Sequence, residues 1–174
     1  MEQVRQTLTE EKEQVRATLT EEKVLDKDAD LQINISFDED KSQIVIEDSG
    51  CGMTKDELID NLGTIANSGT LKYLQQAQAE NKSAENLIGQ FGVGFYSVFM
   101  VADRVELTTR SWQEDAKAWQ WSSEGGGQYE IIPVDFKQRG TRVTVFLKED
   151  AKEFCSAWRL ESIINKYSNY CLFY

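Results

Sequence analysis

The chain has 174 residues, of which 40% are hydrophobic, which is enough to bury one substantial core but too little for two ordinary domains. Its formal charge of -11 argues against a nucleic-acid-binding surface, because such a surface requires clustered lysine and arginine. The absence of histidine excludes serine–histidine and cysteine–histidine catalysis and removes the commonest metal ligand.

Residues 1–23 carry an internal repeat. Glu2–Lys12 and Glu13–Lys23 have the same sequence apart from one position. A period of eleven residues is close to three helical turns, so the repeat predicts a single polar, exposed helix. The alternative is that the duplication is an artefact and not native sequence. The apolar residues of this helix would lie along one narrow stripe: Val4, Leu8, Val15 and Leu19.

A β-hairpin is predicted after this segment. Apolar and polar residues alternate from Leu31 to Phe37, residues 38–41 are turn-forming, and a second apolar run covers Ile44–Ile46. A period of two is typical of a β-strand, so these two runs predict a pair of strands. The first glycine-bearing motif, Asp48-Ser49-Gly50-Cys51-Gly52-Met53, begins where the second strand ends.

A helix is predicted to begin at Thr54. Threonine is a good N-cap, and Glu57 three residues later completes a capping box. Apolar residues with helical spacing continue this helix to about Asn67, and a short second helix is expected around residues 71–78.

The second half of the chain is predicted to consist mainly of strands. A buried helix over Phe95–Val101 follows the second glycine motif, and one or two helices are expected after Ala151. The order of elements predicts an α+β fold, a two-layer sandwich of a mainly antiparallel sheet and helices, and not a Rossmann fold. Strands are expected at Arg104–Arg110, Ala118–Ser122, Tyr129–Val134 and Thr141–Leu147.

Asp48 is the candidate ligand-binding carboxylate, because it lies where a predicted strand leaves the sheet. Gly50 and Gly52 permit positive φ and keep side chains away from a flat ring. A carboxylate here can accept a hydrogen bond from an exocyclic amine, for which the N6 amine of adenine is the obvious candidate. An ordinary turn is the alternative, since aspartate and glycine are also common turn residues.

The second glycine motif, Gly89–Ser97, predicts a helix start that binds phosphate. Gly92 and Gly94 precede the helix, so backbone N–H groups and the positive helix end can face an anion. Neutral backbone donors suit a chain as acidic as this one. The alternative is that these glycines only allow a helix to pack closely on the sheet.

Three stretches form a further pattern: Glu47–Thr54, Leu62–Thr70 and Ile88–Ser97. Together they resemble the N-terminal nucleotide-binding domain of the heat shock protein 90 chaperone family, in the superfamily shared with DNA gyrase B, MutL and histidine kinases. The resemblance covers residues 24–174 and implies a bacterial-type protein with a Bergerat-type ATP-binding fold, truncated at its N-terminal side. Residues 1–23 are then expected to be a separate segment.

The resemblance implies a role for each matching residue. Asp48 would bind the adenine amine, supported by Thr141 through a shared water, and Asn61 would reach the sugar or the α-phosphate. Without the resemblance, Thr141 is simply a β-branched strand residue. The other implied positions are Gly52 and Met53 in the base pocket, Ser68 and Gly69 in a mobile lid, and Gly92, Val93, Gly94 and Phe95 around the phosphates.

The sequence departs from the family in two places. The family usually has lysine at the position of Asn67, so one positive charge near the phosphates is missing. The family's N-terminal helix, with a glutamate that orients the attacking water and an asparagine that holds magnesium, has no counterpart before Asp48. Glu57 and Asn61 show the same spacing, but they follow the Asp48 motif, and we treat this as coincidence. We therefore name no catalytic residue and no metal ligand.

The predicted function is the ATP-binding domain of an ATP-dependent molecular chaperone that assists protein folding. Its ligands would be ATP and ADP, with Mg²⁺ in the complete protein, and this chain alone is expected to hydrolyse ATP weakly or not at all. Regions beyond Tyr174 would bind client proteins and the homodimer partner. The alternatives are a non-catalytic nucleotide-binding or protein-interaction module, and a topoisomerase or mismatch-repair ATPase, which the acidic charge and the Leu62–Thr70 segment disfavour.

Cysteine content and hydropathy predict a soluble, cytoplasmic protein without a membrane partner, and the acidic charge predicts that it has no nucleic-acid partner. Cys51, Cys155 and Cys171 lack C-x-x-C spacing, which disfavours a disulfide framework and a structural zinc site. No apolar run approaches the roughly 20 residues that span a bilayer, and the charged N-terminus lacks the centre of a signal peptide. Cys51 is expected to be a small buried thiol. The tryptophans are expected to be packing or rim residues and not a ligand cage: Trp112, Trp119, Trp121 and Trp158.

Overall fold

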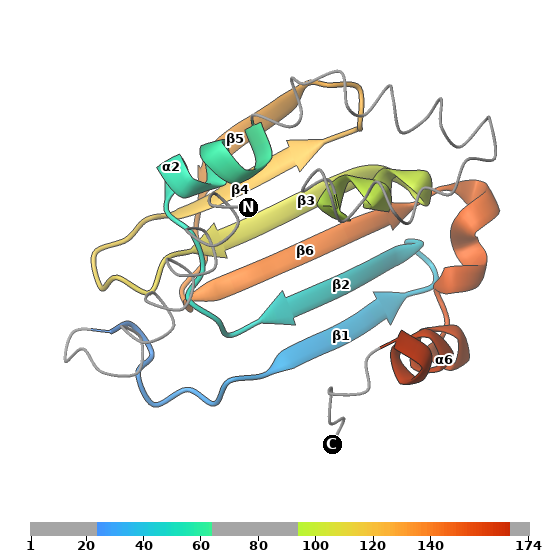
Figure 1. Ribbon diagram of the computed structural model, residues 1–174, viewed down its shortest axis with the longest axis horizontal. Coiled ribbons are helices and arrows are strands. Elements are labelled where there is room, and N and C mark those ends of the chain that lie inside the picture. Colours follow the sequence, from blue (N-terminus) through green and yellow to red (C-terminus); the bar gives the residue numbers. More distant parts are fainter. Residues whose placement is uncertain (1–23, 64–93, 168–174) are drawn as a thin grey trace, which may run out of the picture.

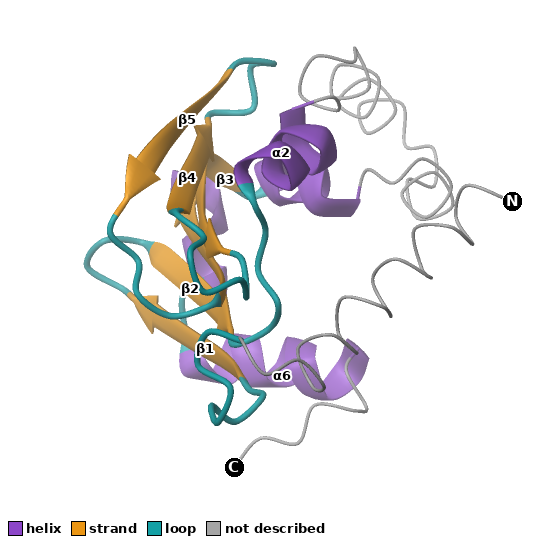
Figure 2. Ribbon diagram, turned by 90° about the vertical axis from the view of Figure 1, so that its left-hand side faces the viewer, coloured by secondary structure: helices purple, strands orange, loops and turns teal. Residues whose placement is uncertain are grey.

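The computed structural model describes residues 24–63 and 94–167. Its centre is a six-stranded antiparallel sheet with the strand order β1-β2-β6-β3-β4-β5 (Figure 1). Helices α2 and α6 lie on one side of this sheet (Figure 2), so the predicted α+β sandwich is confirmed. The strands are β1 (Ile33–Asp38), β2 (Gln43–Asp48), β3 (Ala102–Arg110), β4 (Ala118–Ser123), β5 (Tyr129–Val134) and β6 (Gly140–Leu147).

The helices of the described ranges are short. Helix α2 (Lys55–Leu58) continues into a π-helical turn, η1 (Ile59–Gly63), while η2 (Gly94–Met100) and η3 (Glu149–Phe154) are 3-10 helices. Helix α6 (Ala157–Tyr167) is an ordinary α-helix. In the part of the chain that the structure describes, no helix combines the length and the hydropathy needed to cross a membrane.

Strand β6 lies between β2 and β3, although it follows both of them in the sequence. Asp48, at the end of β2, is opposite Thr141 of β6, and Thr141 is opposite Thr109 of β3. Directly opposed residues of antiparallel strands point to the same face of a sheet, so these three side chains lie side by side. The insertion of β6 therefore assembles a polar row from three separate parts of the sequence.

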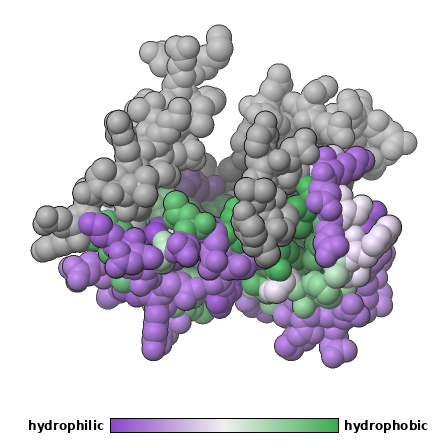
Figure 3. Space-filling model, turned by 90° about the horizontal axis from the view of Figure 1, so that it is seen from below, coloured by the Kyte–Doolittle hydropathy of each residue, from purple (hydrophilic) through white to green (hydrophobic). Residues whose placement is uncertain are grey.

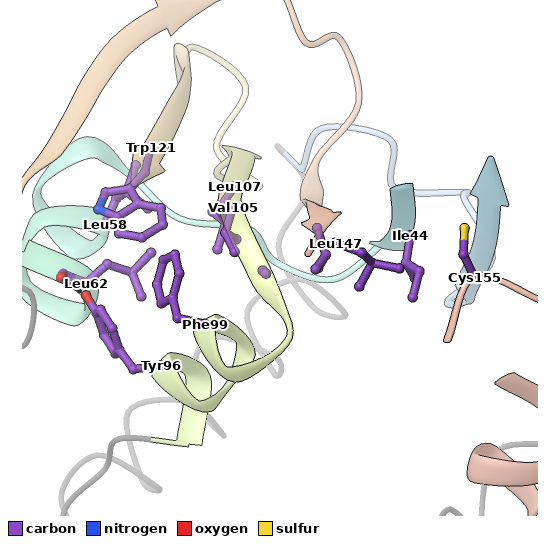
Figure 4. Packing of buried hydrophobic residues seen from close by; sticks show 12 residues of the cluster. Ile44, Leu58, Leu62, Tyr96, Phe99, Val105, Leu107, Trp121, Leu147 and Cys155 are labelled. Atoms are coloured by element: carbon purple, nitrogen blue, oxygen red, sulfur yellow. Dashed lines mark hydrogen bonds between the residues drawn. The ribbon is translucent and has the colours of Figure 1, made fainter. Parts of the chain in front are cut away.

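The hydrophobic core lies between the helices and the sheet, and its largest side chains gather over β3 and β4 (Figure 4). Trp121 of β4 is 0% exposed and is opposite Leu107 of β3 in the register. Leu58 of α2 and the rings of Tyr96 and Phe99 of η2 face these strands (Figure 4). Burial of each such side chain stabilises the fold by about 1.5–3 kcal/mol. The cluster continues through Val145 and Leu147 of β6 to Ile44 of β2, so the core joins the helices to the whole middle of the sheet.

The helix predicted at Thr54 begins there, with both halves of the capping box formed. The backbone N–H of Glu57 donates to Thr54 Oγ1 at 3.3 Å, and the backbone N–H of Thr54 donates to Glu57 Oε2 at 2.7 Å. The α-helical hydrogen-bond pattern ends at Leu58, where the predicted helix changes to a π-helical turn. Its predicted continuation to Asn67 lies outside the described residues.

The buried helix predicted over Phe95–Val101 is present as the 3-10 helix η2. Three residues per turn align Tyr96 with Phe99, and their ring centroids lie 6.0 Å apart. Both rings are buried in the core. The sequence therefore predicted the position and the burial of this helix correctly but not its type.

The predicted hairpin and the four predicted C-terminal strands are confirmed, with ends that differ by at most two residues. The helices expected after Ala151 are η3 and α6. The repeat helix over residues 1–23 and the short helix over residues 71–78 fall outside the described residues, and both stay predictions.

Strand β1 is an edge strand, and its apolar side is only partly covered. Ile33 is 58% exposed, Phe37 is 37% exposed, and Ile46 on the neighbouring strand is 40% exposed. Viewed from below, hydrophobic residues reach the surface between hydrophilic ones (Figure 3). The alternating pattern predicted the strand, but the exposure of its apolar side depends on what packs over it.

Candidate functional site

Asp48 is a half-buried carboxylate at the end of β2. Its Oδ1 accepts a hydrogen bond from the backbone N–H of Gly50 at 2.8 Å. Burial raises the pKa of Asp48, and the charge of Glu47 adds to this, while the backbone N–H groups of Gly50 and Thr141 and the charge of Arg139 lower it. A partly desolvated carboxylate with one oxygen held in place is suited to accept a hydrogen bond from a ligand.

Two glycines allow the backbone to approach closely beside Asp48. Gly52 has φ +61°, and a Cβ there would lie 1.9 Å from the carbonyl oxygen of Arg110. Gly140 has φ +114°, and a Cβ there would lie 2.1 Å from the carbonyl oxygen of Asp48. Only glycine fits either position without a shift of the backbone. An ordinary turn therefore does not fully explain the first motif, because the backbone of Gly52 packs against Arg110 of β3.

Thr109 of β3 is fully buried next to Met53 and Gly140, and its hydroxyl makes three hydrogen bonds. Its Oγ1 accepts from the backbone N–H of Met53 at 2.9 Å and donates to the carbonyl oxygen of Gly140 at 3.1 Å. It also lies 3.2 Å from Oγ1 of Thr141. Sequence reasoning missed Thr109, and the only signal was its place at the end of a predicted strand.

Arg139 holds the loop after Asp48 and is only 3% exposed. One guanidinium nitrogen, Nη1, donates to the carbonyl oxygens of Ser49 at 2.7 Å and Gly50 at 2.9 Å. Its backbone N–H donates to the carboxylate of Asp26 at 3.2 Å. Sequence reasoning assigned no role to Arg139, although it directly precedes Gly140 and Thr141.

The structure brings four of the predicted site residues together at this end of the sheet: Asp48, Gly52, Met53 and Thr141. A fifth, Asn61, is exposed on η1, and its Nδ2 donates to Sδ of Met53 at 3.6 Å. Its predicted contact with a sugar or an α-phosphate stays a prediction.

The predicted phosphate-binding half of the site is described only in part. Gly94 is the first residue of η2. The ring of Phe95 packs edge-on against Tyr96 and Trp121, at centroid distances of 5.6 and 5.7 Å, so this partly buried side chain packs against the core cluster. The remaining predicted positions lie outside the described residues: Ser68, Gly69, Gly92 and Val93.

A polar hollow of about 620 Å³ lies on another side of Asp48. It is lined by residues 26–30, Gln32, Asn34, residues 47–49 and residues 138–139. Its lining does not include Gly52, Met53 or Thr141. Pockets for flat organic ligands are mostly apolar, so this acidic hollow is not the expected base pocket.

The other predicted candidates are structural in the described ranges. Cys51 is half-buried and Cys155 is buried, both are free thiols, and burial raises the pKa of each. Trp121 is the centre of the core, and Trp158 is 75% exposed. The predicted packing role is confirmed for Trp121, whereas Trp158 is an exposed residue of α6 and Cys51 is less buried than expected.

A comparison of sequences identifies the family. The profile of the "Histidine kinase-, DNA gyrase B-, and HSP90-like ATPase" family matches residues 16–144, which is more than half of the chain. The chain belongs to this ATPase family. The α+β sandwich described above agrees with this ATPase fold, and the predicted resemblance to the superfamily is confirmed.

Within this ATPase family, the chain is similar to bacterial proteins named "Chaperone protein HtpG". That of Chlorobaculum tepidum is 49% identical over 150 residues, which is 84% of this chain and 24% of that protein. That of Chlorobium phaeovibrioides is 54% identical over 139 residues, which is 79% of this chain and 22% of that protein. That of Pasteurella multocida is 50% identical over 144 residues, or 82% and 23%. The chain thus spans about a quarter of the length of the curated relatives it matches.

The part of the site that the structure describes combines polar side chains with glycine backbone. The carboxylate of Asp48 and the hydroxyl of Thr141 are neighbouring polar groups, and the glycine backbone beside them is bare. Within residues 24–63 and 94–167, no group of three or more cysteine, aspartate or glutamate side chains is placed to hold a metal ion, and we assign magnesium to no described residue.

Proposed function

We propose that this chain is the ATP-binding domain of a cytoplasmic chaperone that uses ATP to assist protein folding. One observation carries the proposal. The half-buried carboxylate of Asp48 lies beside Thr141, and the neighbouring backbone at Gly52 and Gly140 has no side chains. Membership of the ATPase family and about 50% identity to the HtpG chaperones support it.

In the proposed complex, Asp48 accepts a hydrogen bond from the adenine N6 amine, and Thr141 supports this contact. The bare backbone at Gly52 and the side chain of Met53 face the base, while Asn61 reaches the sugar or the α-phosphate. Residues 92–95 bind the phosphates, and Ser68 and Gly69 open the lid. We further propose that residues 24–174 form the binding domain and that residues 1–23 are a separate segment.

We propose that the complete protein is an ATPase, with Mg²⁺ at the phosphates, and that it dimerises and binds unfolded clients through other regions. For the chain itself we propose weak or absent hydrolysis. Glu57 supports this reading, because its carboxylate accepts from the backbone N–H and the hydroxyl of Thr54 at 2.7 and 2.9 Å. It acts as a helix cap, so the spacing of Glu57 and Asn61 does not need a catalytic explanation.

The decisive test is calorimetric titration of the 174-residue chain with ADP. We expect the parent to bind ADP and Asp48→Asn to bind it at least about 10-fold more weakly, because hydrogen bonds to charged groups are worth about 1.5–3 kcal/mol. Asp103→Asn, an exposed change at the start of β3, is the matched control and should bind like the parent. Absence of ADP binding by the parent would favour the non-catalytic interaction module, and equal binding by Asp48→Asn would show that Asp48 does not bind the base.

A further inference from the structure

We propose that Thr109 is a positioning residue that makes the site selective for 6-amino over 6-oxo purines, by fixing the direction of the hydrogen bond made by the Thr141 hydroxyl. The inference rests on the proposed function, since it concerns how the same site distinguishes one purine from another.

The hydrogen bonds of Thr109 use the full capacity of a hydroxyl group, which has one proton and two lone pairs. Its proton goes to the carbonyl oxygen of Gly140 at 3.1 Å, and one lone pair accepts the backbone N–H of Met53 at 2.9 Å. One lone pair remains for the neighbouring hydroxyl of Thr141 at 3.2 Å. Thr141 is therefore the donor in this pair.

A committed proton changes what Thr141 offers to a ligand. Once its proton is donated to Thr109, Oγ1 of Thr141 presents only lone pairs on its open side. Asp48 lies opposite Thr141 in the register and is an acceptor when ionised. The site therefore presents two neighbouring hydrogen-bond acceptors.

Two acceptors match an exocyclic amine, which has two N–H donors, and repel a carbonyl oxygen at the same position. The match also holds if a water bridges Asp48 and Thr141. Both protons of that water would be taken by the two acceptors, so it could only accept from the ligand. A purine with a 6-amino group is then favoured and one with a 6-oxo group is rejected, because its oxygen would face acceptors only.

Burial makes this arrangement difficult to reverse. Thr109 is 0% exposed, so water does not compete for its hydroxyl. Turning its proton toward Thr141 would break the hydrogen bond to the carbonyl oxygen of Gly140, and no water could replace this donor at a fully buried hydroxyl. The buried Thr109 hydroxyl thus fixes the direction of the hydrogen bonds from Thr141 to Thr109 and from Thr109 to Gly140.

The test compares the dissociation constants of ADP and IDP, which differ at position 6 of the purine, by calorimetry on the 174-residue chain. We expect the parent to prefer ADP. In Thr109→Val the hydroxyl of Thr141 is free to turn and donate, so the ratio of the IDP constant to the ADP constant should fall about 3- to 10-fold, the value of one hydrogen bond. Thr109→Ser keeps the hydroxyl and should restore the parental ratio.

A double-mutant comparison separates positioning from a purely structural effect. In a Thr141→Val background, adding Thr109→Val should leave the ratio unchanged, because Thr109 acts through Thr141. If Thr109→Val does not fold, as judged by circular dichroism, Thr109→Cys is the second variant. Its thiol is a weak donor and a weak acceptor. The ratio of the IDP constant to the ADP constant should therefore lie between the ratio of Thr109→Ser and that of Thr141→Val.

The outcomes distinguish this inference from the proposed function. Two results would overturn the role of Thr109 and leave the nucleotide site intact. One is a ratio of the IDP constant to the ADP constant that Thr109→Val leaves unchanged, and the other is a parent that binds both nucleotides equally. A parent that binds neither nucleotide would overturn both proposals.

Discussion

Asp48 combines a proposed binding role with an unfavourable effect on the fold. Burial is the largest influence on its carboxyl group and raises its pKa, although Gly50, Thr141 and Arg139 oppose the shift. A raised carboxyl pKa means that the folded protein holds the proton more tightly than the unfolded chain does. The ionised form that accepts a hydrogen bond from an amine is therefore the form that the fold disfavours.

Replacement of Asp48 by asparagine is expected to preserve or increase stability at neutral pH while weakening ADP binding. From about pH 4, the ordinary carboxyl range, up to the raised pKa, the folded state binds more protons than the unfolded state, so the contribution of Asp48 to stability falls as pH rises. Urea unfolding should show Asp48→Asn at least as stable as the parent at pH 7, with the difference shrinking toward pH 4.

The matched control is Asp103→Asn, which removes one acidic charge from the -11 chain at an exposed position. It should reproduce any general effect of reduced charge but not the pH-dependent part. A variant Asp48→Asn that is clearly less stable than the parent at pH 7 would show instead that the ionised carboxylate stabilises its own loop.

At the scale of single elements, the start of α2 connects the first glycine motif to the rest of the site. The helix has only one α-helical turn before η1 begins, so little hydrogen bonding of its own supports it. The two hydrogen bonds of the capping box between Thr54 and Glu57 give this short helix additional support. Since η1 carries Asn61, the cap also places one predicted ligand contact.

Loss of the cap should therefore be measurable in both stability and binding. Thr54→Ala is expected to lower the free energy of unfolding by about 1 kcal/mol, the usual value of an N-cap, and to weaken ADP binding. Thr54→Ser keeps the hydroxyl and should retain both properties. Unfolding in urea and calorimetric titration provide the two measurements, and equal stability of the alanine variant and the parent would contradict the argument.

At the scale of the whole molecule, Trp121 joins the helical layer to the sheet. Its ring lies 5.7 Å from that of Phe95 and stacks on Tyr129 at 6.4 Å, measured between centroids. Its indole N–H is buried without a hydrogen-bond partner among the described residues. The ring therefore stabilises the fold through its size and its packing.

Trp121→Ala should lower the free energy of unfolding by about 3–5 kcal/mol, as other large aromatic truncations do. Trp121→Phe should lose less than half of that, because the phenyl ring refills most of the space and removes an unpaired N–H group. Circular dichroism in urea measures both. Trp158→Ala, at a residue 75% exposed, is the control and should change stability little. A phenylalanine variant as unstable as the alanine variant would show that the N–H group has a partner.

The features that could be predicted from the sequence are those that depend on neighbours along the chain. The capping box joins Thr54 to Glu57, and the hairpin joins strands separated by a short turn, so local patterns predict both. The glycines of the first motif are recognisable as a turn, but the contact of Gly52 with the carbonyl oxygen of Arg110, which only glycine allows, appears only in the folded chain.

Periodicity and local backbone chemistry were sufficient to predict the α+β class, the strands and the position of the candidate carboxylate Asp48. The placement of Thr109 and Arg139 at the same end of the sheet as this carboxylate follows instead from contacts between distant parts of the chain. Insertion of β6 between β2 and β3 brings Thr109 to Met53, 56 positions apart in the chain, and Arg139 to Gly50, 89 positions apart. Hydrogen bonds over such separations depend on strand order, and no local pattern encodes them.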